Sequence, residues 1–156
     1  MPKITREEVR VPADVMPEAR DEYITNYLKA TRETGRLMLF ACDQKIEHLN
    51  KDFYGEGIDI ADLDPEHLFK IGSEGVCGVL AGQRGLVAQY AADYPEINYL
   101  IKMNSKTNLV GTKQEDPYSP QLYDLDAVLA MKEAGQQQPS LIVCPASLVL
   151  NWQEEC

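Results

Sequence analysis

The chain alternates short apolar runs with amphipathic stretches, and this alternation predicts strands and helices in turn. Apolar runs bounded by glycine or polar residues predict strands at 37–41, 76–80, 99–103 and 140–144. Apolar residues at helical spacing predict helices at 21–34, from 64 to 72 or 75, and at 85–93, 125–134 and 146–154. Strands separated by helices imply right-handed crossovers and a parallel sheet with helices packed over it, which is an α/β fold.

Several residues mark where the predicted helices begin and end. Gly35 suits the left-handed position that ends the first helix. The acidic, glycine-containing stretch 49–63 predicts a long surface loop, after which Asp64 is expected to cap the second helix and Pro65 to be its first residue. The residues of this second helix expected to face the core are Leu68, Phe69 and Ile71.

The first predicted strand leads directly into polar and titratable side chains. A run as short as 37–41 fits a strand that is covered on both faces in a parallel sheet. In such folds the chemistry gathers at the carboxyl ends of the strands, where Asp43, Gln44 and His48 are expected. Asp43 is therefore a candidate catalytic carboxylate, and a capping or loop aspartate is the alternative.

Lys102 interrupts the third predicted strand, which is otherwise apolar. If that strand is central, the Lys102 ammonium is either paired with a carboxylate such as Asp43 or has a lowered pKa. The alternative is that the strand ends earlier and Lys102 reaches solvent. Asn104 and Lys106 follow at two and four residues, so strand alternation places all three side chains on one face.

Composition indicates one soluble domain and limits its partners. The chain has 156 residues, 44% of them hydrophobic, and 25 acidic against 15 basic residues give a net charge of −10. This charge opposes binding to nucleic acid and to anionic membranes, and a small anionic substrate would need a locally basic pocket. Because the sequence shows neither a membrane span nor a secretion signal, we expect a cytoplasmic protein.

The histidines and cysteines do not have the spacing of a metal site. His48 and His67 match no recognised ligand spacing, and His67, in the first turn of a predicted helix, is expected to face solvent. The four cysteines contain no Cys-x-x-Cys pair, and three of the four lie inside apolar runs; the four are Cys42, Cys77, Cys144 and Cys156. We therefore expect no metal, no other cofactor and no disulfide framework.

Three segments carry a specific family resemblance: 40–48, 64–67 and 99–107. In order and spacing they resemble the N-terminal half of archaeal-type class I fructose-bisphosphate aldolases, relatives of the deoxyribose-phosphate aldolases, over about residues 18–135. The resemblance implies a (β/α)8 barrel, which takes about 250 residues when complete. The expected fold is therefore a partial barrel of about four parallel strands with alternating helices.

The resemblance also implies a chemistry and roles for individual residues. Such aldolases hold a dihydroxyacetone phosphate unit as a lysine Schiff base, whose protonated imine withdraws electrons from the bond to be broken. Asp43 is implied to lie beside the imine and assist proton transfer, while Gln44 and His48 shape the mouth of the site. The residues implied to line the third strand are Lys102, Asn104 and Lys106, with Lys102 a second candidate catalytic residue.

The end of the chain departs from the aldolase pattern. Residues 139–155 resemble the strand and helix that follow the nucleotide loop in Swi/Snf-type helicase-like ATPases, but the Gly-x-x-x-x-Gly-Lys loop is absent. The alternative is a terminal strand and helix that cover the exposed edge of a partial sheet. The expected organisation is an arm at 1–17, a partial barrel at 18–135 and a separate segment at 136–156.

The functional expectation is an aldolase fragment that acts on sugar phosphates but has no turnover alone, because the family's nucleophilic lysine lies on a later strand. A non-catalytic module that binds a sugar phosphate or a protein is the alternative, and a fragment of a helicase-like ATPase is a third reading. Open strand edges predict association into homo-oligomers.

Overall fold

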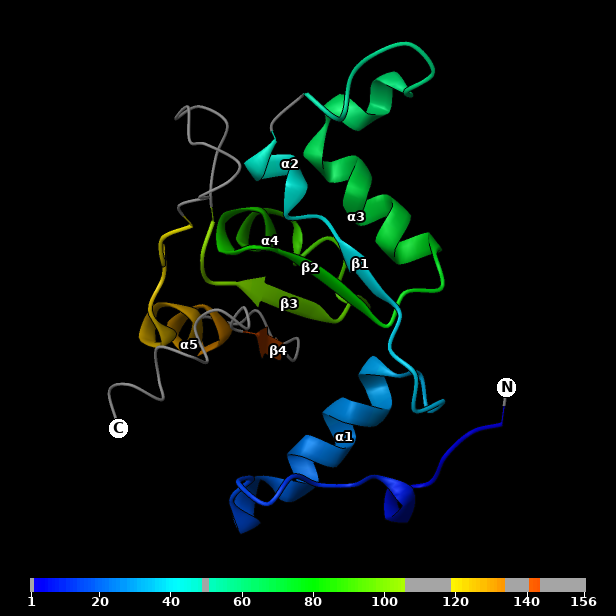
Figure 1. Cartoon of the computed structure of the whole chain (residues 1–156), viewed down its shortest axis with the longest axis vertical. Helices are drawn as coiled ribbons and strands as arrows, with labels where there is room; N and C mark the ends of the chain where they lie inside the picture. The colour runs from blue at the N-terminus through cyan, green and yellow to red at the C-terminus, as the bar shows by residue number, and fades with distance from the viewer. Residues whose placement is uncertain (1, 49–50, 106–118, 134–140, 144–156) are drawn as a thin grey trace.

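The computed structural model describes residues 2–48, 51–105, 119–133 and 141–143. Four parallel strands form one sheet in chain order (Figure 1): β1 (Leu39–Ala41), β2 (Val79–Gln83), β3 (Tyr99–Lys102) and β4 (Leu141–Val143). The helices are α1 (Arg20–Ala30), α2 (Gln44–Glu47), α3 (Pro65–Glu74), α4 (Arg84–Tyr90) and α5 (Leu125–Glu133), with short 3-10 turns at Arg6–Glu8, Pro17–Ala19 and Ile60–Leu63. The predicted α/β class and parallel sheet are confirmed.

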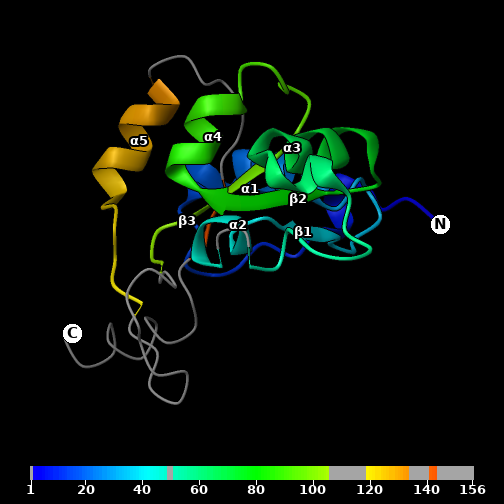
Figure 2. The same cartoon turned by 90° about the horizontal axis from the view of Figure 1, so that it is seen from above.

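The main core lies between one face of the sheet and the helices α3 and α4 that pack on it; we call this face the outer face and the opposite one the inner face. Figure 2 shows α3 and α4 together on one side of β2. Alternate strand residues, among them Leu80 and Ile101, point to this side and are fully buried. Phe69 of α3 fills the centre, with its ring centroid 4.9 Å from that of Tyr90 and 6.0 Å from that of Tyr99. These apolar contacts fix α3 and α4 against the strands.

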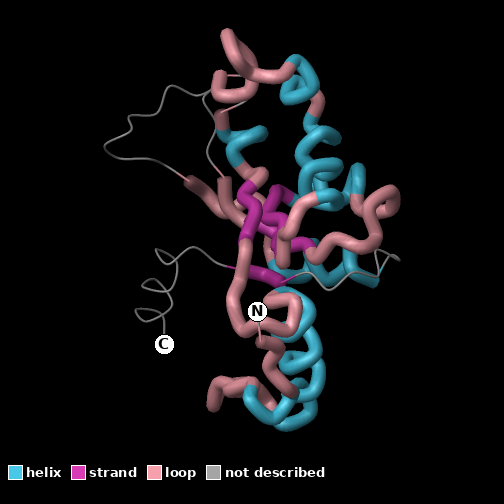
Figure 3. The backbone as a smooth tube through the Cα atoms, turned by 90° about the vertical axis from the view of Figure 1, so that its right-hand side faces the viewer, coloured by secondary structure: helices cyan, strands magenta, loops and turns pink. Residues whose placement is uncertain are grey.

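The inner face of the sheet carries a smaller apolar cluster of Val79, Ala81 and Leu100, against which Ala30 of α1 packs. α1 lies beyond the amino ends of the strands and α2 beyond the carboxyl end of β1 (Figures 1 and 3). Gly78 lies where α1 meets the sheet, and a Cβ added there would be 1.9 Å from the Ala30 carbonyl oxygen. The position therefore requires glycine.

β1 differs from the prediction of a strand covered on both faces. Leu39 is 39% exposed, Ala41 is also exposed, and Phe40 between them is partly buried against the main core. Leu39 and Ala41 point to the inner face, which no described segment covers next to β1. The prediction of a strand covered on both faces was therefore wrong.

The predicted element boundaries hold to within a few residues. α1 ends at Ala30, before 34, because Arg32 and Glu33 already adopt left-handed φ angles of 51° and 60°. β2 begins at Val79, and Val76, expected in that strand, is 75% exposed. The helix predicted at 146–154 lies outside the described residues.

α3 begins as predicted but presents a narrower apolar face. The Asp64 side chain accepts a hydrogen bond from the Glu66 N–H at 3.0 Å, and Pro65 is the first helical residue. Phe69 is buried as predicted, and so is Leu68, but Ile71 is exposed. Ile71 is two positions from Phe69, which is about 200° around a helix, so the two side chains cannot share a face.

Candidate active site

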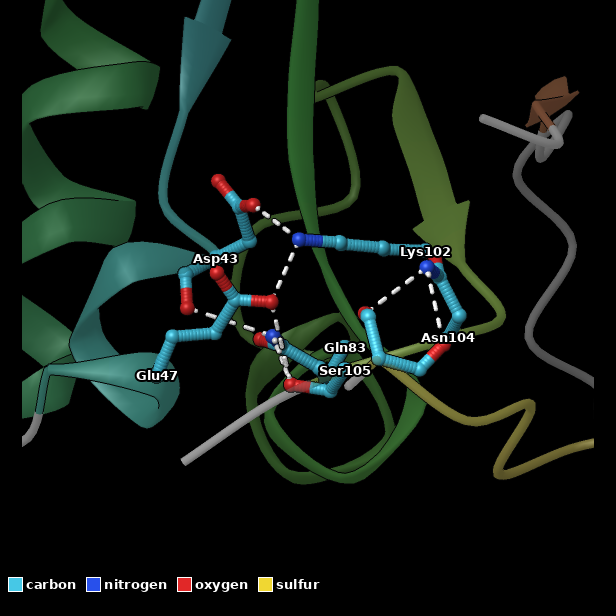
Figure 4. Close-up of polar contacts among 7 residues, drawn as sticks. Asp43, Glu47, Gln83, Lys102, Asn104 and Ser105 are labelled. Atoms are coloured by element: carbon cyan, nitrogen blue, oxygen red, sulfur yellow. Dashed lines mark hydrogen bonds and ion pairs between the residues drawn. The ribbon is translucent and has the colours of Figure 1, made fainter. Parts of the chain in front are cut away.

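Asp43 lies directly beyond β1, at the position that precedes α2. Its side chain makes no capping hydrogen bond to that helix. The carboxylate instead accepts a hydrogen bond from the Lys102 ammonium, with Oδ2 2.7 Å from Nζ (Figure 4). The reading of Asp43 as a mere helix cap is therefore wrong, and its carboxylate is directed toward the end of β3.

Lys102 is the last residue of β3 and bridges two carboxylates. Its Nζ lies 2.7 Å from Asp43 Oδ2 and 2.5 Å from Glu47 Oε1 (Figure 4). The predicted pairing with Asp43 is confirmed, and with 22% of its side chain exposed, Lys102 does not extend into solvent. Burial acts to lower the pKa of Lys102, but hydrogen bonds and charge from Asp43 and Glu47 outweigh it and raise the pKa above its usual value. Lys102 is a fixed ammonium ion at neutral pH.

Glu47 completes this cluster, and the sequence reading missed it. Its side chain is only 7% exposed, and it follows Asp43 by four residues at the end of the single-turn helix α2. Residues four apart lie on one side of a helical turn, so both carboxylates reach the same ammonium. That spacing was the signal in the sequence that could have revealed Glu47.

Gln83 and Ser105 extend the cluster through hydrogen bonds to Asp43 and Glu47. Gln83 ends β2, is 2% exposed, and its Nε2 donates to the Asp43 main-chain oxygen and to Ser105 Oγ, both at 3.2 Å (Figure 4). Ser105 Oγ in turn donates to Glu47 Oε1 at 3.2 Å. The carboxyl ends of β1, β2 and β3 are thereby joined by side-chain hydrogen bonds, and sequence reading missed both residues.

Gln44 and His48, predicted to shape the mouth of a site, lie near the cluster in sequence but do not contact it. Gln44 is exposed at the start of α2, and His48 Nδ1 pairs with Asp52 instead of turning toward Asp43. A role for either in holding a substrate stays a prediction.

Asn104 and Lys106 were predicted to share a face with Lys102. β3 ends at Lys102, and Asn104 forms an isolated antiparallel bridge with Gln121. Its Nδ2 donates to Ser119 Oγ at 2.9 Å. Because β3 ends before Asn104, a face shared by Asn104 and Lys102 stays a prediction, and Lys106 lies outside the described residues.

Lys45 is an unexpected buried cation beside the cluster. Its Nζ donates to the Asp62 main-chain oxygen at 2.5 Å and lies 4.6 Å from the centre of the Phe53 ring. Burial is the main cause that lowers the pKa of Lys45, while Asp62 and Asp64 act in the opposite direction. These contacts fix the loop after α2 against that helix.

Among the described residues, the other titratable groups near this end of the sheet form no group of metal ligands. His67, expected to face solvent, is partly buried with Nε2 3.5 Å from Asp62 Oδ1. Within the described part of the chain, no three side chains of histidine, cysteine, aspartate or glutamate converge as metal ligands. Over the same residues, no helix combines the length and apolar character needed to cross a bilayer.

A family model described as DeoC/LacD family aldolase matches residues 37–139, the stretch that contains β1, β2 and β3 with the strand ends described above. The chain belongs to this aldolase family. The match reaches 139, beyond the boundary at 135 expected from the sequence, and the helicase-like resemblance of residues 139–155 falls almost entirely outside it.

Two relatives of this aldolase-family chain are similar well above chance. The fructose-bisphosphate aldolase/6-deoxy-5-ketofructose 1-phosphate synthase of Methanocaldococcus jannaschii is 51% identical over 132 residues, which are 84% of this chain and 42% of the relative. The solved structure of a fructose-bisphosphate aldolase from Slackia heliotrinireducens is 72% identical, with a TM-score of 0.81 over 89% of this chain and 43% of that one.

A solved archaeal fructose 1,6-bisphosphate aldolase shares the fold with this chain at 22% identity, with a TM-score of 0.51 over 69% of this chain and 39% of that one. The aldolase-family chain thus spans less than half the length of each of these relatives. Three of its parallel strands, with their helices, match part of the barrel of these aldolases.

Proposed function

We propose that this chain supplies the N-terminal strands of a class I, Schiff-base fructose-bisphosphate aldolase that acts on sugar phosphates such as dihydroxyacetone phosphate. The observation that carries the proposal is the Lys102 ammonium held between Asp43 and Glu47 at the carboxyl ends of the strands, in a member of an aldolase family. Barrel enzymes place their chemistry at this end of the sheet.

The cluster suits the proton transfers of imine chemistry. A protonated imine on a substrate ketone withdraws electrons from the adjacent carbon-carbon bond, and a carboxylate beside it stabilises the cation and moves protons. In the proposed mechanism Asp43 supplies this carboxylate, and Lys102 supplies a fixed positive charge that orients it. The reaction requires no metal or organic cofactor in this proposal.

Lys102 itself is unsuited to form the imine. The attacking amine must be neutral, whereas the two carboxylates raise the pKa of Lys102 despite its burial. No other lysine of the chain matches the family's nucleophile by motif, so we propose that these 156 residues alone have no aldolase turnover.

Borohydride trapping tests this proposal. The chain is incubated with dihydroxyacetone phosphate, reduced, and measured as the intact protein by mass spectrometry. We expect no adduct on this chain, while a full-length family member treated in parallel gains the mass of one reduced substrate. A stable adduct on the chain would overturn the proposed lack of covalent capture and locate the lysine by peptide mapping.

A non-catalytic module that binds a sugar phosphate or a protein is the second candidate, and the open inner face beside β1 favours it. Thermal shift measurements separate the candidates: a sugar phosphate should raise the melting temperature if the chain binds it, whereas a nucleotide should raise it only for an ATPase fragment. The net charge of −10 favours neither nucleic acid nor an anionic membrane as partner, and the proposed compartment is the cytoplasm.

We also propose that copies of the chain associate through β1. The Cys42 N–H donates to the Ala81 oxygen at 2.7 Å, so by alternation the main-chain groups of Phe40 face β2 and those of Leu39 and Ala41 face the open edge. Together with the exposed inner-face side chains, this unpaired edge is a surface on which another strand can add.

The variant Leu39→Lys tests the role of the edge. A lysine there places charge on the inner face at the unpaired strand, so we expect a lower weight-average mass by light scattering at equal concentration. Met16→Lys, which changes another exposed apolar residue outside the sheet, should leave the mass as in the wild type. A wild-type chain that is a monodisperse monomer contradicts the proposal.

A further inference from the structure

Five side chains from three strand ends form a closed ring of hydrogen bonds (Figure 4). Lys102 Nζ donates to Asp43 Oδ2 and to Glu47 Oε1, and Ser105 Oγ donates to the same Glu47 oxygen. Gln83 Nε2 then joins Ser105 to the Asp43 main-chain oxygen, which returns the ring to its start. Each member constrains the position of the next.

The two carboxylates of the ring differ in exposure and in their hydrogen bonds. Asp43 has 19% of its side chain exposed and lies at the rim, whereas Glu47 has 7% exposed and accepts from both Lys102 and Ser105. Glu47 thus faces the interior of the ring, and Asp43 faces the space in which a substrate is proposed to bind. The buried carboxylate is the one placed to hold the lysine, and the rim carboxylate is the one placed to meet a reactant.

The donor and acceptor groups of Gln83 determine which atoms of the ring donate and which accept. A main-chain carbonyl oxygen only accepts, so the Gln83 side chain must present its amide nitrogen to Asp43. The same nitrogen then donates to Ser105 Oγ, which leaves the serine hydroxyl proton for Glu47. Glu47 therefore receives its donors from fixed directions.

We propose that Glu47 is a positioning residue, which fixes the Lys102 side chain beside Asp43 and so sets the orientation of the Asp43 carboxylate. Its functional meaning rests on the aldolase function proposed above, but the geometry it controls can be measured without turnover. In the described part of the chain, Asp43 and Glu47 are the charged groups that pair with Lys102.

The titration of Lys102 tests this role. In protein carrying ¹³C-labelled lysine, the Cε signal of Lys102 is assigned by its disappearance in Lys102→Arg, and its titration midpoint is measured by NMR. We expect Glu47→Gln, which keeps the side-chain shape, to lower the midpoint by about one pH unit, roughly a tenfold change in the proton affinity of Lys102. Glu47→Asp, which retains the charge, should restore part of the shift.

A matched control removes another carboxylate that pairs with a lysine. Glu66 Oε1 lies 3.7 Å from Lys70 Nζ on the exposed side of α3, so Glu66→Gln should leave the Lys102 midpoint unchanged. An unchanged midpoint in a folded Glu47→Gln variant, together with a lowered one in Asp43→Asn, would overturn the proposal. Glu47 would then be a buried carboxylate that does not position the Lys102 side chain.

A measurement on the wild-type chain covers the case in which Glu47→Gln does not fold. With ¹⁵N-labelled lysine at pH 7, the hydrogen-bonded ammonium of Lys102 should give a slowly exchanging signal with a through-hydrogen-bond coupling to the Glu47 side-chain carboxyl carbon. A rapidly exchanging ammonium without that coupling overturns the proposal. Neither experiment depends on aldolase activity, so failure of the proposed function and failure of this inference are distinguishable.

Discussion

Replacement of Lys102 by methionine should cost the fold about 2–4 kcal/mol in free energy of unfolding, because it leaves the Asp43 and Glu47 carboxylates together without a cation. Glu47 is almost fully buried, and its charge cannot be screened by solvent as a surface carboxylate is. Urea unfolding followed by circular dichroism measures the loss.

Two comparisons identify the cause of that loss. Lys70→Met removes an exposed lysine 3.7 Å from Glu66 and should cost no more than about 0.5 kcal/mol. Adding Glu47→Gln to Lys102→Met should recover part of the stability, because it removes one of the two carboxylate charges that are left without a cation. Equal losses for Lys70→Met and Lys102→Met would contradict the description of the cluster as a buried ion pair.

The effect of Lys102→Met should also depend on pH. Because the pKa of Lys102 is raised in the folded chain, its stabilising contribution is complete below the unfolded-state value of about 10.5 and is lost as pH rises through the folded-state value. The difference in unfolding free energy between wild type and Lys102→Met should thus be constant from pH 7 to 9 and shrink above about pH 10.5.

Gly78→Ala, directly before β2, should cost about 3 kcal/mol in free energy of unfolding, the upper end of the range typical of overpacking. The added Cβ would lie 1.9 Å from the Ala30 carbonyl oxygen, a backbone atom that cannot rotate away. Gly78 is also held on both sides, since its N–H donates to the Met38 oxygen at 2.9 Å and its oxygen accepts from Asn98 Nδ2 at 2.9 Å. Either α1 or the start of β2 must therefore move.

Gly85 provides the matched control for this substitution. It is exposed in α4, and a Cβ added there meets no atom within 4 Å. Gly85→Ala should leave stability unchanged or raise it by about 0.4–1 kcal/mol, because alanine restricts the unfolded chain. The two melting curves, compared by circular dichroism, decide the matter, and a Gly78→Ala chain as stable as wild type would show that α1 does not pack as described.

The sequence predicted the pairing of Asp43 with Lys102 for a reason that does not need coordinates. Parallel strands bring their carboxyl ends to one edge, and an ammonium in an apolar strand requires a carboxylate nearby. Glu47 was missed because its burial comes from contact with the end of β3, although its spacing of four residues from Asp43 could have pointed to it. The predicted face of Asn104 stays a prediction, because strand alternation holds only while the strand continues and β3 ends two residues earlier.

The error at β1 likewise concerns contacts with other parts of the structure, which a local sequence pattern does not report. The apolar pattern of 37–41 correctly predicted a strand, but it did not predict how far that strand is covered, since Leu39 and Ala41 are exposed. The end of α1 was predicted too far along the chain for a local reason. Arg32 and Glu33 take left-handed φ angles, which side-chain periodicity does not reveal. Element type was predictable, whereas the surroundings of each element were not.

The position of α1 in the chain has a consequence for synthesis. α1 precedes every strand in sequence, and its last residue, Ala30, packs on the Val79, Ala81 and Leu100 cluster. Ribosomes add residues from the N-terminus at about 5–20 per second, so this helix leaves the exit tunnel seconds before β2 does. A nascent polypeptide thus already carries the cover for its inner apolar surface when that surface emerges, which limits its exposure to chaperones and to other newly made chains.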